Sequence, residues 1–307
     1  MSRILVTGAS GLLGLNVSLE AAEKHTVYGT VKDHPIEPTS FSALQTDLLA
    51  PGAVEQTLEQ TQPDWVINCA ALALLDVCET YPDLAAKMNI DFPRNLAKIV
   101  ARGGARLLHV STDAVFDGEK GDYSEEDQPN PLSVYGRTKL AGERAVAQAN
   151  PEAIIARVNL FGWSLSGRRS LAEFFYTNLC AGNPVMGFTD VYFCPMLVND
   201  LAQVLLRMME ARLSGLYHVF SPECASKHEF GIAIAHRFSF DEGLIEPVEV
   251  ERSGLAAARS PRLTMRVDRL RQDLPGPLPT WREGLERFYQ QEQSGYPGFL
   301  RSLSPAA

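Results

Sequence analysis

The sequence predicts an α/β protein in which a doubly wound parallel sheet carries a smaller C-terminal lobe. Two observations lead to this fold class. Over residues 1–160, short apolar runs alternate with longer amphipathic segments, as expected where strands and helices follow one another along the chain. Beyond residue 160 the alternation gives way to less regular segments rich in glycine and proline, which favours a separate lobe.

The predicted strands of the first part are the apolar runs at 3–10, 26–31, 64–71, 105–112 and 153–162, with a helix at 12–24 after the first run. Strands that alternate with helices form parallel sheets, and right-handed crossovers cover both faces. Residues 1–160 are therefore predicted to form one domain and residues 161–307 mainly a second lobe. A helix at 198–211 and a strand at 215–220 would return about residues 197–222 to the sheet.

Composition excludes several classes of protein. The 307 residues carry a formal net charge of −9 and no run of lysine or arginine, so binding to nucleic acid is not expected. No apolar run reaches about 18 residues, and the chain starts directly with a strand and a glycine turn. We therefore expect neither a membrane span nor a signal peptide.

The cysteines indicate a reducing compartment. They are odd in number, widely scattered and free of any C-x-x-C pair: Cys69, Cys78, Cys180, Cys194 and Cys224. Neither a disulfide framework nor a zinc site is expected from this pattern. We predict a cytoplasmic protein with reduced thiols and no metal.

The first chemical motif is a glycine turn, Gly8-x-x-Gly11-x-x-Gly14, between the first strand and its helix. Glycines at such a turn let the backbone approach a pyrophosphate, whose charge then faces amide groups at the helix N-terminus. The spacing alone is a weak signal, because an ordinary strand-to-helix turn can produce it. Its position in the first βαβ unit of the chain favours dinucleotide binding.

The end of the second strand bears on which dinucleotide is bound. Thr30 and Lys32 occupy it, with Asp33 just beyond. A cation there accepts a 2′-phosphate, whereas an acid holds a ribose 2′-hydroxyl, so NADP(H) is favoured and NAD(H) is the alternative. Lys32 could also be an ordinary solvated charge. Asp47, after the short third strand, suits an adenine amino group or merely caps the next helix.

The second motif is Tyr135-x-x-x-Lys139, which opens a helix. Residues four apart share a helix face, so the lysine ammonium can favour the phenolate of the tyrosine. This pair is common by chance, but here it follows the segment 110–118, where Thr112 lies at a strand end. Thr112 can hydrogen-bond a substrate oxygen that Tyr135 protonates, while Lys139 also holds the nicotinamide ribose.

With these residues in view, the chain resembles the extended short-chain dehydrogenase/reductase family, and within it the dTDP-4-dehydrorhamnose reductase branch. Several segments in the right order are far more specific than any one of them. They are VTGASGLLG, VINCAAL, KMNIDFPRNLA, VSTDAVFDG, GDYSEEDQPNPLSVYGRTKLAGE, ARVNLFGW, FCPMLVNDLA, GLYHVFSPECASKHEFG and SPRLTMRVDRL.

The resemblance implies a Rossmann domain, a nicotinamide cofactor and a catalytic set of Thr112, Tyr135 and Lys139. It also implies that Asn89 supports the lysine through water, and that the strand end at 69–71 lines the cofactor. The residues expected to bind the cofactor are Gly8, Ser10, Gly11, Leu12, Leu13, Gly14, Thr30, Lys32, Asp47, Leu48, Cys69, Ala70, Ala71, Tyr135 and Lys139.

Ala114 separates two reactions of this superfamily. The related sugar-nucleotide 4,6-dehydratases usually read Thr-Asp-Glu where this chain reads Thr112-Asp113-Ala114. Without the second carboxylate an elimination lacks an evident base, so dehydration is disfavoured. The dehydrorhamnose reductases commonly carry tyrosine at this position. The alanine opens space near the substrate and leaves the identity of the sugar open.

Substrate contacts are expected from the second lobe and its junction with the sheet. The candidates are Thr112, Asp113, Asn159, Phe161, Trp163, Phe193, Pro195 and Arg262, whose aromatic and cationic groups suit a base and a diphosphate. Phe161 and Trp163 could instead pack the lobe interface. Arg168 and Arg169 could reach an anionic substrate or be solvated charges.

These features favour an NAD(P)H-dependent reductase of a 4-keto sugar nucleotide. Two alternatives stay open: a reductase or epimerase of another carbonyl substrate, and a non-catalytic NADP-binding regulatory subunit, because a methionine adenosyltransferase partner protein belongs to the same branch. The complete set of Thr112, Tyr135 and Lys139 favours the enzyme. The expected partner is a small-molecule substrate, and a homodimer is the candidate assembly.

Overall fold

A computed structural model describes residues 1–253 and 260–305 of the chain. Within these ranges, seven strands form one parallel sheet in the order β11-β6-β5-β4-β1-β2-β3. The strand order reverses between β1 and β4, which makes this a doubly wound Rossmann-type sheet. The strands are β1 (Arg3–Thr7), β2 (Thr26–Val31), β3 (Ser42–Gln45), β4 (Trp65–Asn68), β5 (Arg106–Thr112), β6 (Ile154–Val158) and β11 (Gly215–Val219).

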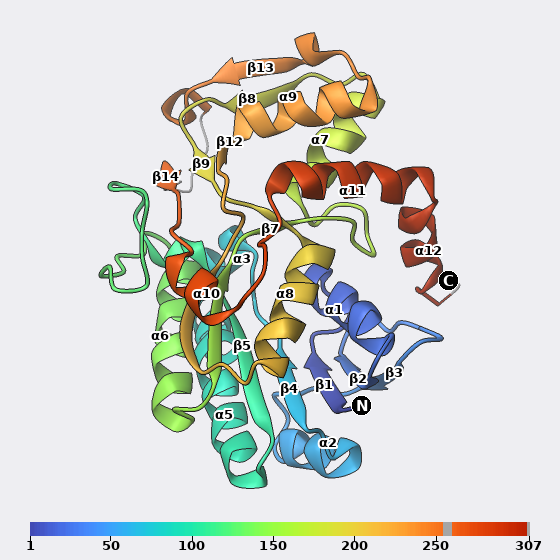
Figure 1. Ribbon diagram of the computed structural model, residues 1–307, viewed down its shortest axis with the longest axis vertical. Coiled ribbons are helices and arrows are strands. Elements are labelled where there is room, and N and C mark those ends of the chain that lie inside the picture. Colours follow the sequence, from blue (N-terminus) through green and yellow to red (C-terminus); the bar gives the residue numbers. More distant parts are fainter. Residues whose placement is uncertain (254–259, 306–307) are drawn as a thin grey trace.

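Helices lie on both faces of this sheet (Figure 1). They include α1 (Leu12–Ala22), α2 (Ala53–Thr61), α3 (Leu75–Thr80), α4 (Pro82–Ala86), α5 (Phe92–Gly103), α6 (Val134–Ala149), α8 (Val198–Glu210) and α10 (Asp268–Asp273). A π-helical turn, Lys87–Asp91, joins α4 to α5, and a 3₁₀ turn, Asp113–Val115, follows β5.

Alternating side chains of the buried strands build two cores. In β1, Ile4 and Val6 belong to a core that also contains Leu15 of α1 and Leu201 of α8. Leu5 points to the opposite face and joins a core with residues of α2, α5 and α6: Val54, Phe92, Leu96, Ala97, Val100 and Val146. This two-sided burial explains why the strands read as continuous apolar runs and not as alternating ones.

The second part of the chain forms a smaller group of elements that lies above the carboxyl ends of the strands in Figure 1. It contains β7 (Leu160–Phe161), α7 (Leu171–Cys180), β8 (Val185–Phe188), β9 (Tyr192–Phe193), β10 (Met196–Leu197), β12 (Ala225–Ser226), α9 (Lys227–Phe238), β13 (Ile245–Val248), β14 (Arg262–Leu263), α11 (Trp281–Gln293) and α12 (Tyr296–Ser302). Short 3₁₀ turns occur at Glu242–Leu244 and Val250–Ser253. Residues 198–219 belong to the sheet group, because α8 packs on α1 and β11 pairs with β6 at the sheet edge.

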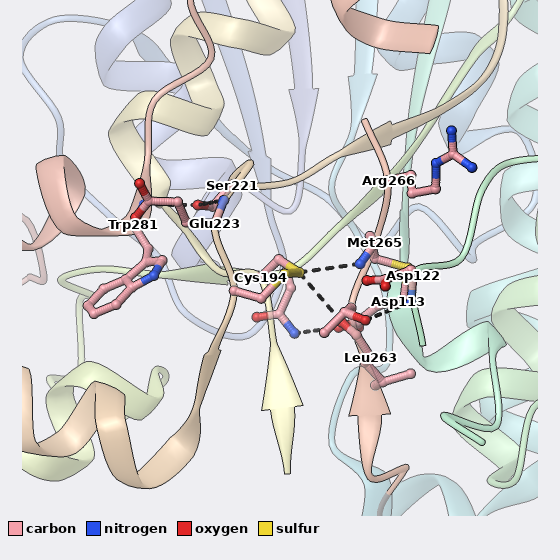
Figure 2. The surroundings of a disulfide bond; sticks show 12 residues. Asp113, Asp122, Cys194, Ser221, Glu223, Leu263, Met265, Arg266 and Trp281 are labelled. Carbon is pink, nitrogen blue, oxygen red and sulfur yellow. Dashed lines mark hydrogen bonds between the residues drawn. A yellow bond between two sulfur atoms is a disulfide. The ribbon is translucent and has the colours of Figure 1, made fainter. Parts of the chain in front are cut away.

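One expectation from the cysteines is wrong: Cys194 and Cys224 form a disulfide, and their Cα atoms lie 4.1 Å apart. The two residues are distant in sequence, but β9 and β12 pair antiparallel, with Ala225 opposite Phe193, and this brings the neighbouring cysteines together. The sulfur of Cys194 also accepts a 3.3 Å hydrogen bond from the backbone N–H of Met265 (Figure 2). The other three cysteines are free thiols. Among the described residues, no helix is long and apolar enough to cross a membrane.

Candidate functional site

A cleft of about 340 Å³ opens where the strand order reverses, beyond the carboxyl ends of β1 and β4. This is the position at which doubly wound sheets bind ligands. Most of the predicted cofactor residues line it, namely Gly8, Ser10, Gly11, Thr30, Lys32, Asp47, Leu48, Cys69, Ala70 and Ala71. The other five do not line the cleft: Leu12, Leu13 and Gly14 belong to the first turn of α1, and Tyr135 and Lys139 belong to α6.

The glycine turn is as tight as its spacing predicts. Gly8 has φ +73°, a backbone conformation that side chains disfavour, and an added Cβ would lie 3.0 Å from the backbone of Ala70. A Cβ on Gly14 would lie 2.2 Å from the carbonyl oxygen of Gly8. Glycines are therefore required both for the turn and for the approach of α1 to it.

Lys32 and Asp47 lie on the same side of the cleft and form an ion pair, with 3.1 Å between Nζ and Oδ2. The hydrogen bond to Asp47 raises the pKa of Lys32. The pKa of Asp47 is lowered by the backbone N–H of Leu49 and then by Lys32. The Leu49 contact is a local turn within 47–49, so Asp47 makes a structural contact as well as lining the cleft.

Buried polar side chains link β1, β4 and β5 to one another. Thr7 donates a 2.6 Å hydrogen bond to Asn68, which in turn lies 2.9 Å from Nδ1 of His109. Asn89 holds the next segment, because its side chain accepts a hydrogen bond from the N–H of Leu72 and donates one to the carbonyl of Leu72, both 3.0 Å long. Asn89 occupies the π-helical turn and also donates to Thr138 at 3.1 Å.

Thr112 and Tyr135 come from two elements that pack closely. Thr112 ends β5, and Tyr135 lies in the first turn of α6, which the side chain of Ser133 caps. A Cβ on Gly136 would lie 2.2 Å from the carbonyl oxygen of Ala114, so the glycine after the tyrosine is needed for this packing. The hydroxyl of Thr112 interacts with the phenol of Tyr135.

The pKa values of the tyrosine and lysine are moved by burial. Burial raises the pKa of Tyr135 to about 12, with the hydrogen bond from Thr112 acting in the opposite direction. Burial lowers the pKa of Lys139 to about 8, although Glu143 acts to raise it. The Lys139 ammonium donates a 2.7 Å hydrogen bond to the carbonyl of Val110 and interacts electrostatically with Cys69 in the cleft.

Ser111, the hydroxyl beside Thr112, belongs to a buried support of the site. It donates a 2.5 Å hydrogen bond to Glu143 of α6. Glu143 also receives two hydrogen bonds from Arg157 of β6, at 3.0 and 2.8 Å. Both partners of this ion pair are almost completely buried. The network fixes α6, and with it the tyrosine and lysine, against the sheet.

A smaller cavity of about 120 Å³ lies between α6 and the second group of elements. Of the predicted substrate residues, Asn159 and Phe193 line it, together with Ala114. Asp113 lies behind this wall and accepts a 2.6 Å hydrogen bond from Asn159. Burial raises the pKa of Asp113, while that hydrogen bond opposes the change. Asp113 is therefore buried and hydrogen-bonded by a residue that lines the cavity.

The other six predicted substrate residues do not line this cavity: Thr112, Asp113, Phe161, Trp163, Pro195 and Arg262. Phe161 and Trp163 are core residues; the Trp163 ring stacks on Phe288 at 3.9 Å, and its indole N–H donates to the Phe288 carbonyl. Phe161 and Trp163 therefore have a packing role, which was the alternative to substrate binding in the sequence analysis. Arg262 is exposed on β14, and its backbone N–H donates to the carbonyl of Gly118.

The cavity is also lined by residues that sequence reasoning did not single out: Leu75, Leu132, Ser133, Val191, Tyr192, Lys227, Ser260 and Leu263. Lys227 is the most informative of these, because it brings a cation to this wall and interacts electrostatically with Asp113. The serine and glutamate of the segment 226–229 form a capping-box pattern, which predicts that a helix starts at Lys227. The sequence does not indicate that this helix lies near β5.

Comparison with known proteins gives one consistent result. The model of the RmlD substrate binding domain family matches residues 1–294. A probable low-salt glycan biosynthesis reductase of Haloferax volcanii is 36% identical over 287 residues, which cover 91% of this chain and 95% of that protein. Methionine adenosyltransferase 2 subunit beta of Bos taurus is 35% identical over 271 residues, 85% of this chain and 78% of that protein.

Solved structures are similar over nearly the whole chain. The dTDP-4-dehydrorhamnose reductase of Bacillus anthracis, determined in complex with NADP, superposes with a TM-score of 0.85 at 28% identity, covering 94% of this chain and 99% of that one. A dTDP-4-dehydrorhamnose reductase of Clostridium acetobutylicum superposes with a TM-score of 0.82 at 28% identity, covering 95% of this chain and 99% of that one.

Proposed function

Because the chain belongs to the RmlD substrate binding domain family, within the extended short-chain dehydrogenases/reductases, we propose that it is an NADPH-dependent reductase of a 4-keto sugar nucleotide. The observation that carries this proposal is the position of Tyr135. It interacts with Thr112 and with Asp113. Its partner Lys139 interacts electrostatically with Cys69 of the cofactor cleft, and Asp113 accepts a hydrogen bond from Asn159, which lines the second cavity.

The cleft of about 340 Å³ is where the dinucleotide is proposed to bind, with Gly8, Ser10 and Gly11 at its phosphates and Lys32 at the adenosine ribose. The nicotinamide supplies a hydride to the ketone carbon when the cofactor is bound. The NADP complex of the similar Bacillus reductase favours NADP(H), with NAD(H) as the alternative. Lys139 is proposed to hold the nicotinamide ribose.

Tyr135 then supplies the proton that the new alkoxide requires. With its pKa raised to about 12 by burial, the phenol is protonated at neutral pH and can act as the donor. Thr112, which interacts with the phenol, is proposed to hydrogen-bond the same ketone oxygen and stabilise its developing charge. Lys139 is a cation below its pKa of about 8 and stabilises the phenolate left after transfer.

The residues after Thr112 favour reduction over dehydration. Ala114 lines the second cavity but carries no acid or base. Asp113 is buried and engaged by Asn159, so it does not replace the missing carboxylate. The alanine also leaves space beside the proposed substrate.

A second candidate function rests on the similarity to methionine adenosyltransferase 2 subunit beta. In that case the chain would be a regulatory subunit, and its NADP site would serve binding alone. The two proposals differ in what the second cavity does. A reductase needs it to accept a keto sugar, whereas a regulatory subunit does not.

A ligand screen tests this difference. Nucleotide sugars of several bases and sugars are added to the protein with NADPH, and the thermal midpoint is followed, because a ligand that binds only the folded state raises it. We expect one class of nucleotide sugar to raise the midpoint beyond NADPH alone. If NADPH raises the midpoint and no nucleotide sugar adds to it, the binding subunit is the better assignment.

A further inference from the structure

Arg169 has no role in the chemistry proposed above. It lies in the loop before α7, far in sequence from the glycine turn, yet it lines the cofactor cleft. It also lines an adjoining cavity of about 440 Å³. Ser10 of the glycine turn and His34, just beyond the end of β2, line both cavities together with it. Arg169 therefore belongs to the adenosine end of the cleft.

The backbone of this loop is held rigidly by one buried carboxylate. Glu173 is completely buried and accepts hydrogen bonds from the backbone N–H of Arg169 at 2.8 Å and of Ser170 at 3.1 Å. The N–H and hydroxyl of Ser164 donate to it as well. Ser170 caps α7 in a full capping box. The anchoring uses the main chain of Arg169 and leaves its side chain at the exposed surface.

The charges around the cleft distinguish Arg169 from Lys32. Lys32 forms an ion pair with Asp47, with 3.1 Å between Nζ and Oδ2. Arg169 forms no ion pair with any acidic residue in the part of the chain that the structure describes. Since the guanidinium is always charged and presents several N–H donors in a plane, it is well suited to a phosphate dianion.

We propose that Arg169 is a second cation for the 2′-phosphate of NADP(H), reaching the adenosine ribose from the second lobe while Lys32 approaches it from β2. The inference rests on the proposed dinucleotide cofactor. Arg169 belongs to the loop before α7, whereas Ser10 belongs to the turn after β1. A 2′-phosphate bound here would therefore connect the two parts of the chain. Preference for NADPH then depends on both lobes.

Arg168 provides a matched control. It is the neighbouring arginine, is also exposed, and lines neither of these cavities. Arg169→Gln and Arg168→Gln each remove one exposed charge, so both variants are expected to fold like the parent protein, which their thermal midpoints check. Dissociation constants for NADPH and NADH are measured by titration for the full chain and for both variants. Titration with 2′,5′-ADP and with 5′-AMP repeats the comparison without the nicotinamide.

We expect Arg169→Gln to weaken NADPH and 2′,5′-ADP by about tenfold or more, the usual effect of losing a charged hydrogen bond, and to change NADH and 5′-AMP by less than about twofold. Arg168→Gln should leave all four unchanged. Equal weakening of NADPH and NADH, or no weakening, would overturn the assignment of Arg169 while leaving the reductase proposal intact. Failure of the unmodified protein to bind either dinucleotide would overturn the proposed function itself.

Discussion

At the scale of single residues, the proposed chemistry depends on how burial changes the pKa values of two ionisable groups. Tyr135 and Lys139 lie one helical turn apart, yet burial raises the pKa of the phenol and lowers that of the ammonium. At neutral pH the tyrosine therefore keeps its proton, and the lysine keeps most of its charge. This is the protonation state that a reductase needs for proton donation to an alkoxide.

The pH dependence of the reaction is the first consequence. Lys139 is charged below a pKa of about 8 and loses its proton as the pH rises through that value. Tyr135, with a pKa of about 12, remains protonated over the same range. We therefore predict that kcat/KM falls above about pH 8, by tenfold per pH unit at the limit. Initial rates between pH 6 and 10 measure this, and a level profile up to pH 10 would refute the assignment to Lys139.

Removal of the phenol should affect chemistry far more than binding. Tyr135→Phe takes away the proton donor and leaves the ring, so we predict a fall in kcat of about 10²- to 10⁴-fold. The dissociation constant for NADPH should stay within about threefold. Tyr81→Phe is the matched control, since Tyr81 is an exposed tyrosine outside both cavities, and it should behave as the parent protein. Near-normal turnover by Tyr135→Phe would rule out this mechanism.

At the scale of elements, the position of α6 sets the geometry of the site. The helix crosses the π-helical turn so closely that a Cβ on Gly142 would lie 2.1 Å from the carbonyl oxygen of Asn89. Its other side is fixed by the buried pair of Glu143 and Arg157. Asn89 itself binds Leu72 and Thr138, which gives it a structural role at this crossing.

A methyl group at this crossing should therefore destabilise the protein. For Gly142→Ala we predict a loss of about 1–3 kcal/mol in the free energy of unfolding, as is typical of overpacking. Gly103→Ala is the control, because a Cβ there meets nothing within 4 Å. Urea unfolding of both variants gives the comparison. Equal stability of Gly142→Ala and Gly103→Ala would show that α6 can move without cost.

The disulfide fixes the wall of the second cavity, since Cys194 follows Phe193 and Cys224 precedes β12. It closes a sequence separation of 30 residues, for which removal should cost about 2–4 kcal/mol of unfolding free energy. We predict this loss for Cys224→Ser in non-reducing buffer, whereas Cys180→Ser, at an exposed free thiol, should have little effect. If both variants unfold at the same urea concentration, the disulfide is not formed in solution.

At the scale of the whole molecule, sequence reasoning succeeded where structure is set locally. The apolar run at 26–31 coincides with β2, and the helix opened by Tyr135 is α6. The glycine turn and the lining residues after β4 share one cleft because parallel strands end at the same edge. Each of these features follows from short-range periodicity or from the rules of parallel sheets.

The features that sequence reasoning missed depend on contacts between distant segments. The pairing of β9 with β12 created the disulfide, and no spacing of cysteines indicates that pairing. Trp163 has the same aromatic character whether it stacks on a ligand or on Phe288, so only the fold could place it in the core. The electrostatic interaction between Lys227 and Asp113 likewise requires α9 to lie near the end of β5, which is a contact between distant segments.

The reductase proposal is tested most sharply by following NADPH and product together. A purified 4-keto sugar nucleotide that binds in the screen is mixed with the protein and NADPH, and absorbance at 340 nm is compared with the sugar alcohol formed. Because Ala114 offers no base for elimination, we predict one NADPH oxidised for each ketone reduced. Conversion of an intact hexose nucleotide to a 4-keto-6-deoxy product without net consumption of NADPH would contradict the reductase assignment.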